Sequence, residues 1–135
     1  MAQIVLTDAS VTVNSVDLSD HVTQVVLNYE VDAVEVTAMS DSTHKFTGGL
    51  ANVSATVDFQ QDFADSSVDA TIYPLVGSTT TVVIKPTSSA VGTDNPSYTL
   101  TDTYVASHTP LNASVGDLST TSVEFQGGTL ARATT

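Results

Sequence analysis

Hydrophobic and polar residues alternate with a period of two along most of this chain. In NVSATVDFQQ, residues 52–61, one parity is apolar and the other carries serine, threonine, aspartate and glutamine. The same alternation runs through the segments 23–31, 79–85, 96–106 and 120–126. Strands with one buried and one solvated face are typical of antiparallel sheets. The pattern therefore predicts a mainly β protein, an antiparallel β-sandwich or half-barrel of about seven or eight strands.

The alternation also predicts which residues share a face. Within 96–106, strict parity places Leu100 and Tyr104 on one face and Thr103 and Val105 on the other. Near the N-terminus, VTVNSVDLSDHV, residues 11–22, indicates a hairpin that turns at Asn14 and Ser15, because asparagine tolerates a positive φ.

Three segments depart from the strand pattern. DSSVDATIYPLVG, residues 65–77, predicts one short helix that ends near Tyr73, because Pro74 removes a backbone donor. Residues 38–52 are rich in turn-forming residues and predict a long loop between two strands. Residues 129–135 predict a loose tail. At 135 residues, the whole of 1–135 is expected to form a single domain.

Charge narrows the possible partners. Fifteen acidic residues face three basic ones, for a formal net charge of −12. A protein that grips nucleic acid needs a basic surface to displace counterions from phosphates, and this chain has no basic stripe. No segment approaches the roughly 20 apolar residues of a membrane span, and the N-terminus lacks the pattern of a signal peptide. We expect the protein to be made in the cytoplasm, and used there or assembled there into something larger.

The sequence shows no motif of a catalytic or metal-binding site. His21, His44 and His108 are far apart and lack the spacing of metal ligands, so neither a metal nor a cofactor is expected. The serines lack the context of a catalytic nucleophile. Glu30 and Glu35 are expected on opposite faces of one strand, which does not suit a catalytic pair. We therefore do not expect an enzyme.

Four stretches together carry a family resemblance: VTVNSVDLSDHV, the strand, loop and strand VEVTAMSDSTHKFTGGLANVSATVDFQQDF, SVDATIYPLVG, and the closing SVGDLSTTSVEFQGG. In order and spacing they resemble the tail tube (major tail) proteins of long-tailed bacteriophages, which share a fold with the tube protein of contractile injection systems. The resemblance touches most of the chain. Pro74 inside the helix is a departure from the family pattern.

The resemblance implies a structural virion protein of the phage tail, assembled in the host cytoplasm. Six copies would close into a ring, with strands of every copy joined into one inner barrel, and stacked rings would form the tube through which the genome leaves. The partners would be other copies of the chain and other tail proteins (tape measure, terminator and distal tail protein). DNA would be a passing cargo that the acidic wall repels.

Candidate site residues follow from parity and from the resemblance. For the channel lining we select polar residues of the two strongest strands: Thr56, Asp58, Gln60, Thr121 and Glu124. The loop 38–52 would act as an assembly arm, with Lys45 and Phe46 contacting a neighbour; the alternative is that Phe46 packs on its own core. Arg132 in the tail would dock on an acidic neighbour or remain in solvent.

Two other classes of protein remain open. One is another virion component with a related sandwich: a capsid decoration protein, a tail terminator or a head–tail connector. The other is a secreted β-sandwich binding module, such as an adhesin or a carbohydrate-binding domain. Such a module needs a platform of exposed aromatic residues, and a chain with no tryptophan and 6% aromatic residues supports it weakly.

Overall fold

An antiparallel sheet runs through nearly the whole chain. The structure is a computed structural model that describes residues 5–65 and 67–134. Its described part contains an eight-stranded sheet, which confirms the prediction of a mainly β, antiparallel fold with one short α-helix. The strands are β1 (Ser10–Val13), β2 (Val16–Asp17), β3 (Val22–Glu35), β4 (Phe46–Gln60), β5 (Thr79–Lys85), β6 (Ser97–His108), β7 (Thr120–Gln126) and β8 (Thr129–Ala133).

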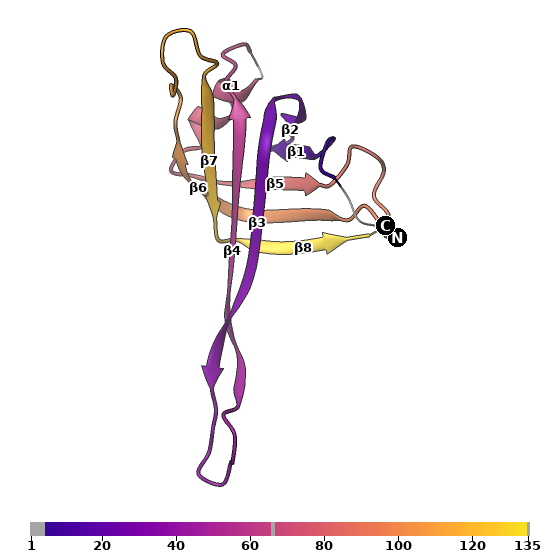
Figure 1. The fold of residues 1–135 in the computed structure, drawn as a ribbon, viewed down its shortest axis with the longest axis vertical. Helices are drawn as coiled ribbons and strands as arrows, with labels where there is room; N and C mark the ends of the chain where they lie inside the picture. The colour runs from indigo at the N-terminus through magenta and orange to yellow at the C-terminus, as the bar shows by residue number, and fades with distance from the viewer. Residues whose placement is uncertain (1–4, 66, 135) are drawn as a thin grey trace.

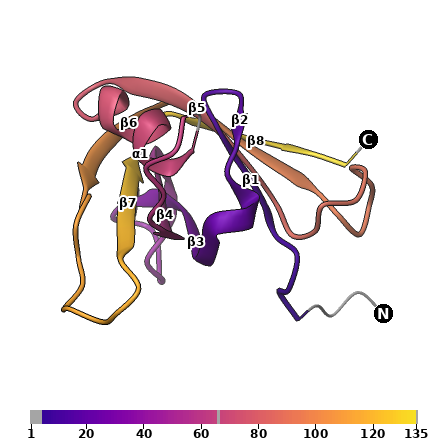
Figure 2. The ribbon, with the colours of Figure 1, turned by 90° about the horizontal axis from the view of Figure 1, so that it is seen from above.

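Strand β6 joins two parts of this sheet. The order is β2-β1-β5-β6-β7-β4-β3, and β8 pairs with β6 outside this path. The first half of β6 pairs with β8, and its second half pairs with β7. As a result, β3, β4 and β7 run along the long axis of the molecule, β5, β8 and the first half of β6 run across it, and the second half of β6 bends to follow β7 (Figure 1). Seen from above, the sheet curls into a half-barrel with the helix near one end (Figure 2).

The turn between β1 and β2 follows the sequence prediction. Val13 pairs with Val16, and the two residues between them, Asn14 and Ser15, have φ values of 50° and 68°. These positive angles are those of a tight hairpin turn.

A bulge in β6 breaks the strict alternation. Asp102 has a φ of 58°, and the pairing with β5 shifts register at this point. Leu100, Thr103 and Val105 are all fully buried, whereas Tyr104 is exposed. The prediction that Tyr104 shares a face with Leu100 is therefore wrong. One extra residue in a strand reverses the facing of every residue after it.

The C-terminal segment is a strand and not a loose tail. Residues 129–133 form β8, in which Leu130 lies opposite Leu100 and Arg132 lies opposite Tyr98; residue 135 lies outside the described residues. Gly128 makes the corner before β8 possible. Its φ is +87°, and a Cβ there would clash with the carbonyl oxygen of Thr101. Only glycine lets the two backbones approach this closely.

A short helical segment covers one end of the sheet. Helix α1 (Val68–Ile72) continues into a 3-10 turn, η2 (Tyr73–Leu75), that contains Pro74. The predicted end near Tyr73 is thus confirmed. A second 3-10 turn, η1 (Ser19–His21), precedes β3. Val68 and Ile72 are fully buried against the sheet.

The core lies between α1 and the apolar face of the sheet. On β4, the alternation predicted from sequence is confirmed: one parity is buried and the other is at least partly solvated. Burying a large aliphatic or aromatic side chain contributes about 1.5–3 kcal/mol. The fully buried side chains come from β1, the residue before η1, α1 and β4 to β7: Val11, Val13, Leu18, Val57, Phe59, Val68, Ile72, Val82, Leu100, Val105, Val123 and Phe125.

Strands β3 and β4 extend beyond the rest of the sheet as a two-stranded arm (Figure 1). Residues 46–52, predicted as part of a loop, belong to β4, so the connection is only residues 36–45. The arm twists where the pairing shifts between Val31 and Ala33. A Cβ on Gly49 would lie 3.0 Å from Cγ2 of Val34. The glycines that resemble a loop signal in the sequence therefore permit close contact between two strands.

Candidate functional site: a polar sheet face, an open edge and an arm

Strands β3, β4 and β7 present one continuous polar face. On β4 this face consists of the partly exposed residues that alternate with the buried ones. Cross-strand pairing aligns it in rows: Gln24, Asp58 and Ser122; Val26, Thr56 and Glu124; Asn28, Ser54 and Gln126. The structure thus brings four of the predicted lining residues together on one face, which we call the polar face: Thr56, Asp58, Gln60 and Glu124.

Thr121 does not belong to the polar face. Its side chain is 1% exposed, and it lies on the same side of β7 as the buried Val123 and Phe125. The Oγ1 atom of Thr121 is 3.0 Å from Nδ1 of His108. The prediction of Thr121 as a lining residue is therefore wrong: its parity is that of the core, and its hydroxyl is satisfied there by a histidine.

The polar face carries acidic groups and no basic ones. Asp58 and Glu124 lie on it, and Glu30 extends it along β3. The three basic residues are elsewhere: Lys85 lies in β5, and Lys45 and Arg132 lie in the arm and in β8. Amide groups cover part of the negative charge. Gln126 Nε2 donates to Glu124 Oε1 at 2.8 Å, and Asn52 Nδ2 donates to Asp32 Oδ1 at 2.7 Å.

A shallow hollow of about 520 Å³ lies along this face. Glu30, Asn28 and Glu124 line it, together with Tyr104 of β6. The sequence pattern assigned Tyr104 to the other face, and only the positive φ of Asp102 brings it here. The one sign of this bulge in the sequence is the aspartate at position 102 within a strand-like segment, because aspartate tolerates a positive φ better than most residues.

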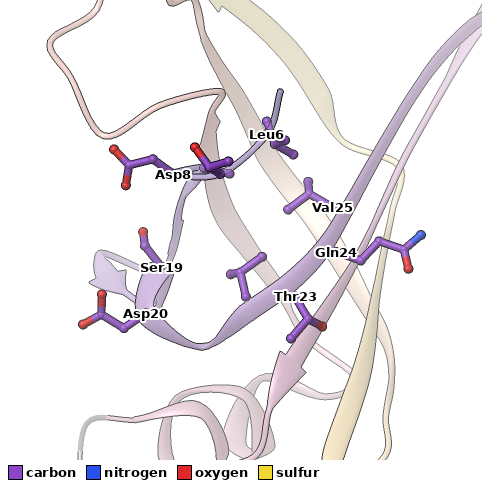
Figure 3. A pocket seen from close by; sticks show the side chains of 10 residues that line it. Leu6, Asp8, Ser19, Asp20, Thr23, Gln24 and Val25 are labelled. Atoms are coloured by element: carbon purple, nitrogen blue, oxygen red, sulfur yellow. The ribbon is translucent and has the colours of Figure 1, made fainter. Parts of the chain in front are cut away.

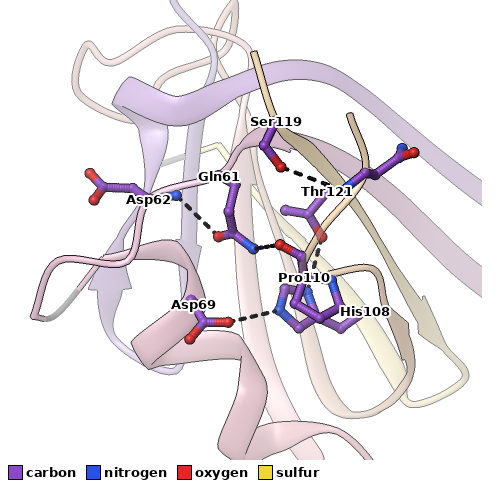
Figure 4. Close-up of polar contacts among 8 residues, drawn as sticks. Gln61, Asp62, Asp69, His108, Pro110, Ser119 and Thr121 are labelled. Atoms are coloured by element: carbon purple, nitrogen blue, oxygen red, sulfur yellow. Dashed lines mark hydrogen bonds and ion pairs between the residues drawn. The ribbon is translucent and has the colours of Figure 1, made fainter. Parts of the chain in front are cut away.

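A buried polar network fixes the helical segment to the sheet (Figure 4). The His108 side chain is 2% exposed; its Nε2 lies 3.4 Å from Asp69 of α1 and its Nδ1 contacts Thr121 of β7. Both ring nitrogens of His108 therefore have partners on other elements. Nearby, Gln61 after β4 donates from Nε2 to the carbonyl oxygen of Pro110 at 2.7 Å, an exposed bond that joins the end of β4 to the β6–β7 connection.

His21 forms a similar contact on the other side of the segment. Its Nε2 lies 2.7 Å from Asp62 Oδ2. Hydrogen bonds from the backbone N–H of Ala64, from His21 and from Ser67 hold the pKa of Asp62 below its usual range. Over residues 5–65 and 67–134, no group of three or more potential ligands is arranged to hold a metal ion. In the same residues, no helix has the length and hydrophobicity to span a bilayer.

Strand β3 has an open edge. Over the described residues it pairs only with β4, so the main-chain groups along its other side have no strand partner. The N-terminal segment 5–9 lies near the first part of this edge and leaves a pocket of about 340 Å³, lined by Leu6, Asp20 and Val25 among others (Figure 3). An open edge of this length is a template for pairing with another chain.

The arm ends in a compact, hydrogen-bonded turn. Lys45 Nζ lies 2.7 Å from Asp41, and this contact lowers the pKa of the Asp41 carboxyl. His44 Nδ1 lies 2.6 Å from Glu35 Oε2 and, with Thr37, lowers the pKa of Glu35. The turn is therefore well defined and not a free loop.

The predicted contact residues are exposed on the arm and on β8. Phe46 is 61% exposed, so it does not pack on the core of its own molecule. Lys45 is also exposed and lies next to it. Arg132 lies on the exposed part of β8, and no ion pair of Arg132 occurs among the described residues.

Comparison with known proteins shows a shared fold. No family model and no curated protein matches the sequence. Among solved structures, a chain in the cryo-EM structure of the anti-feeding prophage tube terminating cap has a TM-score of 0.71 at 12% identity, covering 98% of this chain and 93% of that chain. A chain in the sheath–tube complex of an extracellular contractile injection system has a TM-score of 0.71 at 9% identity, with the same coverage.

A third match comes from a different kind of particle. A chain in the virion of a native gene transfer agent has a TM-score of 0.64 at 12% identity, covering 93% of this chain and 95% of that chain. Identities this low establish the fold and not the function. The half-barrel with its extended β3–β4 hairpin is therefore the fold shared by chains of these injection-system and gene-transfer particles.

Proposed function

We propose that this chain is a structural, non-enzymatic subunit of a phage-like tail or injection particle, and that its copies join edge to edge into a ring whose channel is lined by the polar face. The observation that carries the proposal is the polar face itself. It is acidic, free of basic residues, and bordered by the open edge of β3. The fold shared over nearly the whole chain with tail and injection-particle structures supports it.

Ring closure gives the open edge a partner. A sheet that continues from one copy to the next leaves no free edge, as in a closed barrel. A chain in a gene transfer agent tail refined with C6 symmetry also matches, with a TM-score of 0.52 over 82% of this chain and 81% of that chain. We therefore propose six copies per ring.

The charge of the polar face suits the passage of DNA. Duplex DNA carries one phosphate per about 1.7 Å, so a basic wall would hold it at every ring. Asp58 and Glu124 repel phosphates, the amide of Gln126 donates to Glu124, and the face offers no cation to hold DNA. We propose that DNA moves through the channel without specific contacts.

Two roles in a tail are compatible with this ring. In the first, rings stack into the tube; in the second, a single ring ends the tube. Two of the similar solved structures, with TM-scores of 0.71 and 0.69, are of a tube terminating cap and of a sheath/tube terminator, which favours the terminal ring as a second candidate. Another injection-system match is a chain of a sheath–tube complex.

Negative-stain microscopy of the purified full chain, together with its mass in solution, tests the proposal. Rings or tubes of the 14.0-kDa chain are expected. Long tubes identify the stacking role, and isolated rings identify the terminal role. A protein that remains a single particle at high concentration, or that forms only trimers as a decoration protein would, contradicts the proposal.

A further inference from the structure

Nearly all of the negative charge of this chain lies at its surface without a cationic partner. All fifteen carboxylates belong to residues that the structure describes, and none of them is buried. Among the same residues, the ion pair of Lys45 with Asp41 is the one contact between a carboxylate and a lysine or arginine. Three further carboxylates contact histidines. The other carboxylates have no basic side chain within ion-pair distance in the described part of the chain.

Solubility alone does not account for so large a charge. A net charge of magnitude about 2–8 is sufficient to keep a small domain soluble, whereas this chain carries a formal net charge of −12. Like charges on a compact surface repel one another and destabilise the folded and assembled states. The excess charge therefore has a cost in dilute salt, and that cost falls where ions of the medium screen the carboxylates.

The polar face concentrates part of this charge. Thr56 lies opposite Glu124 and Asp58 lies opposite Ser122, so the two carboxylates are diagonal neighbours on one face. Diagonal neighbours in a sheet are about 7–8 Å apart. That separation is shorter than the Debye length of about 10 Å at 0.1 M salt and longer than the Debye length of about 3 Å at 1 M salt. Their repulsion is therefore felt in dilute salt and largely screened in concentrated salt.

Ring closure increases this repulsion. In the proposed ring, every copy turns its polar face toward one channel, and no basic residue lies on that face to offset the carboxylates. The amide of Gln126 donates to Glu124 but carries no charge. Cations of the medium are then left to neutralise the channel wall. Association of the copies takes up cations, so it strengthens as the salt concentration rises, whereas the binding of a basic protein to DNA releases cations and weakens.

We infer that salt controls the assembly of this protein: its copies associate strongly where a concentrated electrolyte screens the polar face, and the particle is adapted to a medium of high ionic strength. The inference rests on the proposed function and extends it, because it names the condition that regulates ring formation. Some salts also strengthen the burial of apolar surface between copies, and sulfate does so more than chloride. A comparison of the two anions therefore separates screening from hydrophobic association.

Sedimentation of the full chain at a series of protein concentrations measures the concentration at which half of the protein is assembled. The measurement is made in KCl at about 0.1 M and about 1 M, and in sodium sulfate at the same two ionic strengths. The test variant is Asp58→Asn with Glu124→Gln, which removes two charges of the polar face and keeps the size of both side chains. The matched control is Asp65→Asn with Asp94→Asn, which removes two charges from exposed segments outside that face. Microscopy of the same samples identifies rings, and thermal unfolding verifies that both variants fold.

The natural chain is expected to reach half assembly at a protein concentration about tenfold lower in 1 M KCl than in 0.1 M KCl, with a similar change in sulfate. The test variant is expected to assemble well in dilute salt and to change by about threefold or less, and the control to behave as the natural chain does.

Three results overturn the inference and leave the proposed ring intact. Rings of the natural chain could form equally well at both KCl concentrations, or the change could occur in sulfate alone, or the control could lose as much salt dependence as the test variant. If no rings form at any salt concentration, the proposed function itself fails, and the inference fails with it.

Discussion

His108 is nearly buried, and both of its ring nitrogens have partners on different elements. A buried donor or acceptor that loses its partner costs about 1–3 kcal/mol. The role of this residue is therefore structural: it joins α1 to β6 and β7. The sequence offered no sign of this, because Asp69, His108 and Thr121 are far apart along the chain.

Replacing His108 tests that role. His108→Ala is expected to lower the free energy of unfolding by about 2 kcal/mol, because it leaves Thr121 and Asp69 without their partner. Urea unfolding measures the change. His44→Ala is the control: that histidine is 78% exposed and its contact with Glu35 is worth little. Equal effects of the two substitutions would show that the His108 network does not stabilise the fold.

The carboxylate of Asp62 predicts how stability depends on pH. Its pKa is lowered in the folded chain, first by the backbone N–H of Ala64 and then by His21. The unfolded chain therefore binds this proton more tightly, so the stabilisation is present above the ordinary aspartate pKa of about 3.9 and is lost as the pH falls through the lower folded value. Asp62→Asn is expected to flatten the decline between pH 5 and 3, roughly the range set by that ordinary value. Asp65→Asn is the control, and an unchanged slope in Asp62→Asn would contradict this account.

Individual side chains were predictable wherever alternation was unbroken. The buried and solvated faces of β4 follow directly from parity, and Asp58 and Gln60 lie where parity places them. The face occupied by Tyr104 could not be predicted. The positive φ of Asp102 moves the side chains after it to the opposite face of the strand, and the alternation of apolar and polar residues does not reveal such a bulge. Thr121 has the parity of the core, and a threonine satisfied by a distant histidine is buried at little cost.

At the scale of elements, the corner between β7 and β8 depends on one glycine. Gly128→Ala is expected to cost at least about 2 kcal/mol, because it adds a steric clash with the backbone of Thr101 to the strain of a positive φ. Gly127→Ala is the matched control: its φ is +71° and nothing lies within 4 Å of the added Cβ. Thermal unfolding compares them. A loss in Gly128→Ala no larger than in Gly127→Ala would contradict the close approach.

The arm gives a second prediction at this scale. Lys45→Ser with Phe46→Ser is expected to prevent stacking and to leave the free energy of unfolding of the single chain unchanged within about 0.5 kcal/mol, because both residues are solvent-exposed. Sedimentation of assembled protein measures the first quantity and urea unfolding the second. The control, Thr43→Ser, alters a neighbouring exposed residue of the turn. Normal stacks from the double variant would rule out these residues as contacts.

Elements that pair with distant partners escaped prediction for a physical reason. β8 is short and mostly exposed, and it is a strand because β6 offers it a partner. The residues 46–52 contain Gly48 and Gly49, which local preference assigns to a loop. Their actual role, close contact with Val31 and Val34 of β3, exists only once the hairpin has formed. The helix end was predictable because Pro74 acts locally.

For the whole molecule, the charge of the polar face predicts how an assembly treats DNA. Asp58→Lys with Glu124→Lys is expected to give assemblies that bind duplex DNA at low salt and release it as salt rises, because the new cations displace counterions from phosphates. Natural assemblies, and the control Asp94→Lys in an exposed loop, are expected to bind at least tenfold less. Binding is measured by co-sedimentation. Equal binding by the control would indicate that the polar face does not line the channel.

The central claim is that copies of this chain close into a ring around the polar face, and a cryo-EM map of the assembled full chain tests it most directly. The account predicts a closed ring in which the outer edge of β3 pairs with a strand of the neighbouring copy, with Asp58 and Glu124 facing the channel. A molecule that stays solitary with the β3 edge free, or a channel lined by Lys45, Lys85 and Arg132, would contradict it.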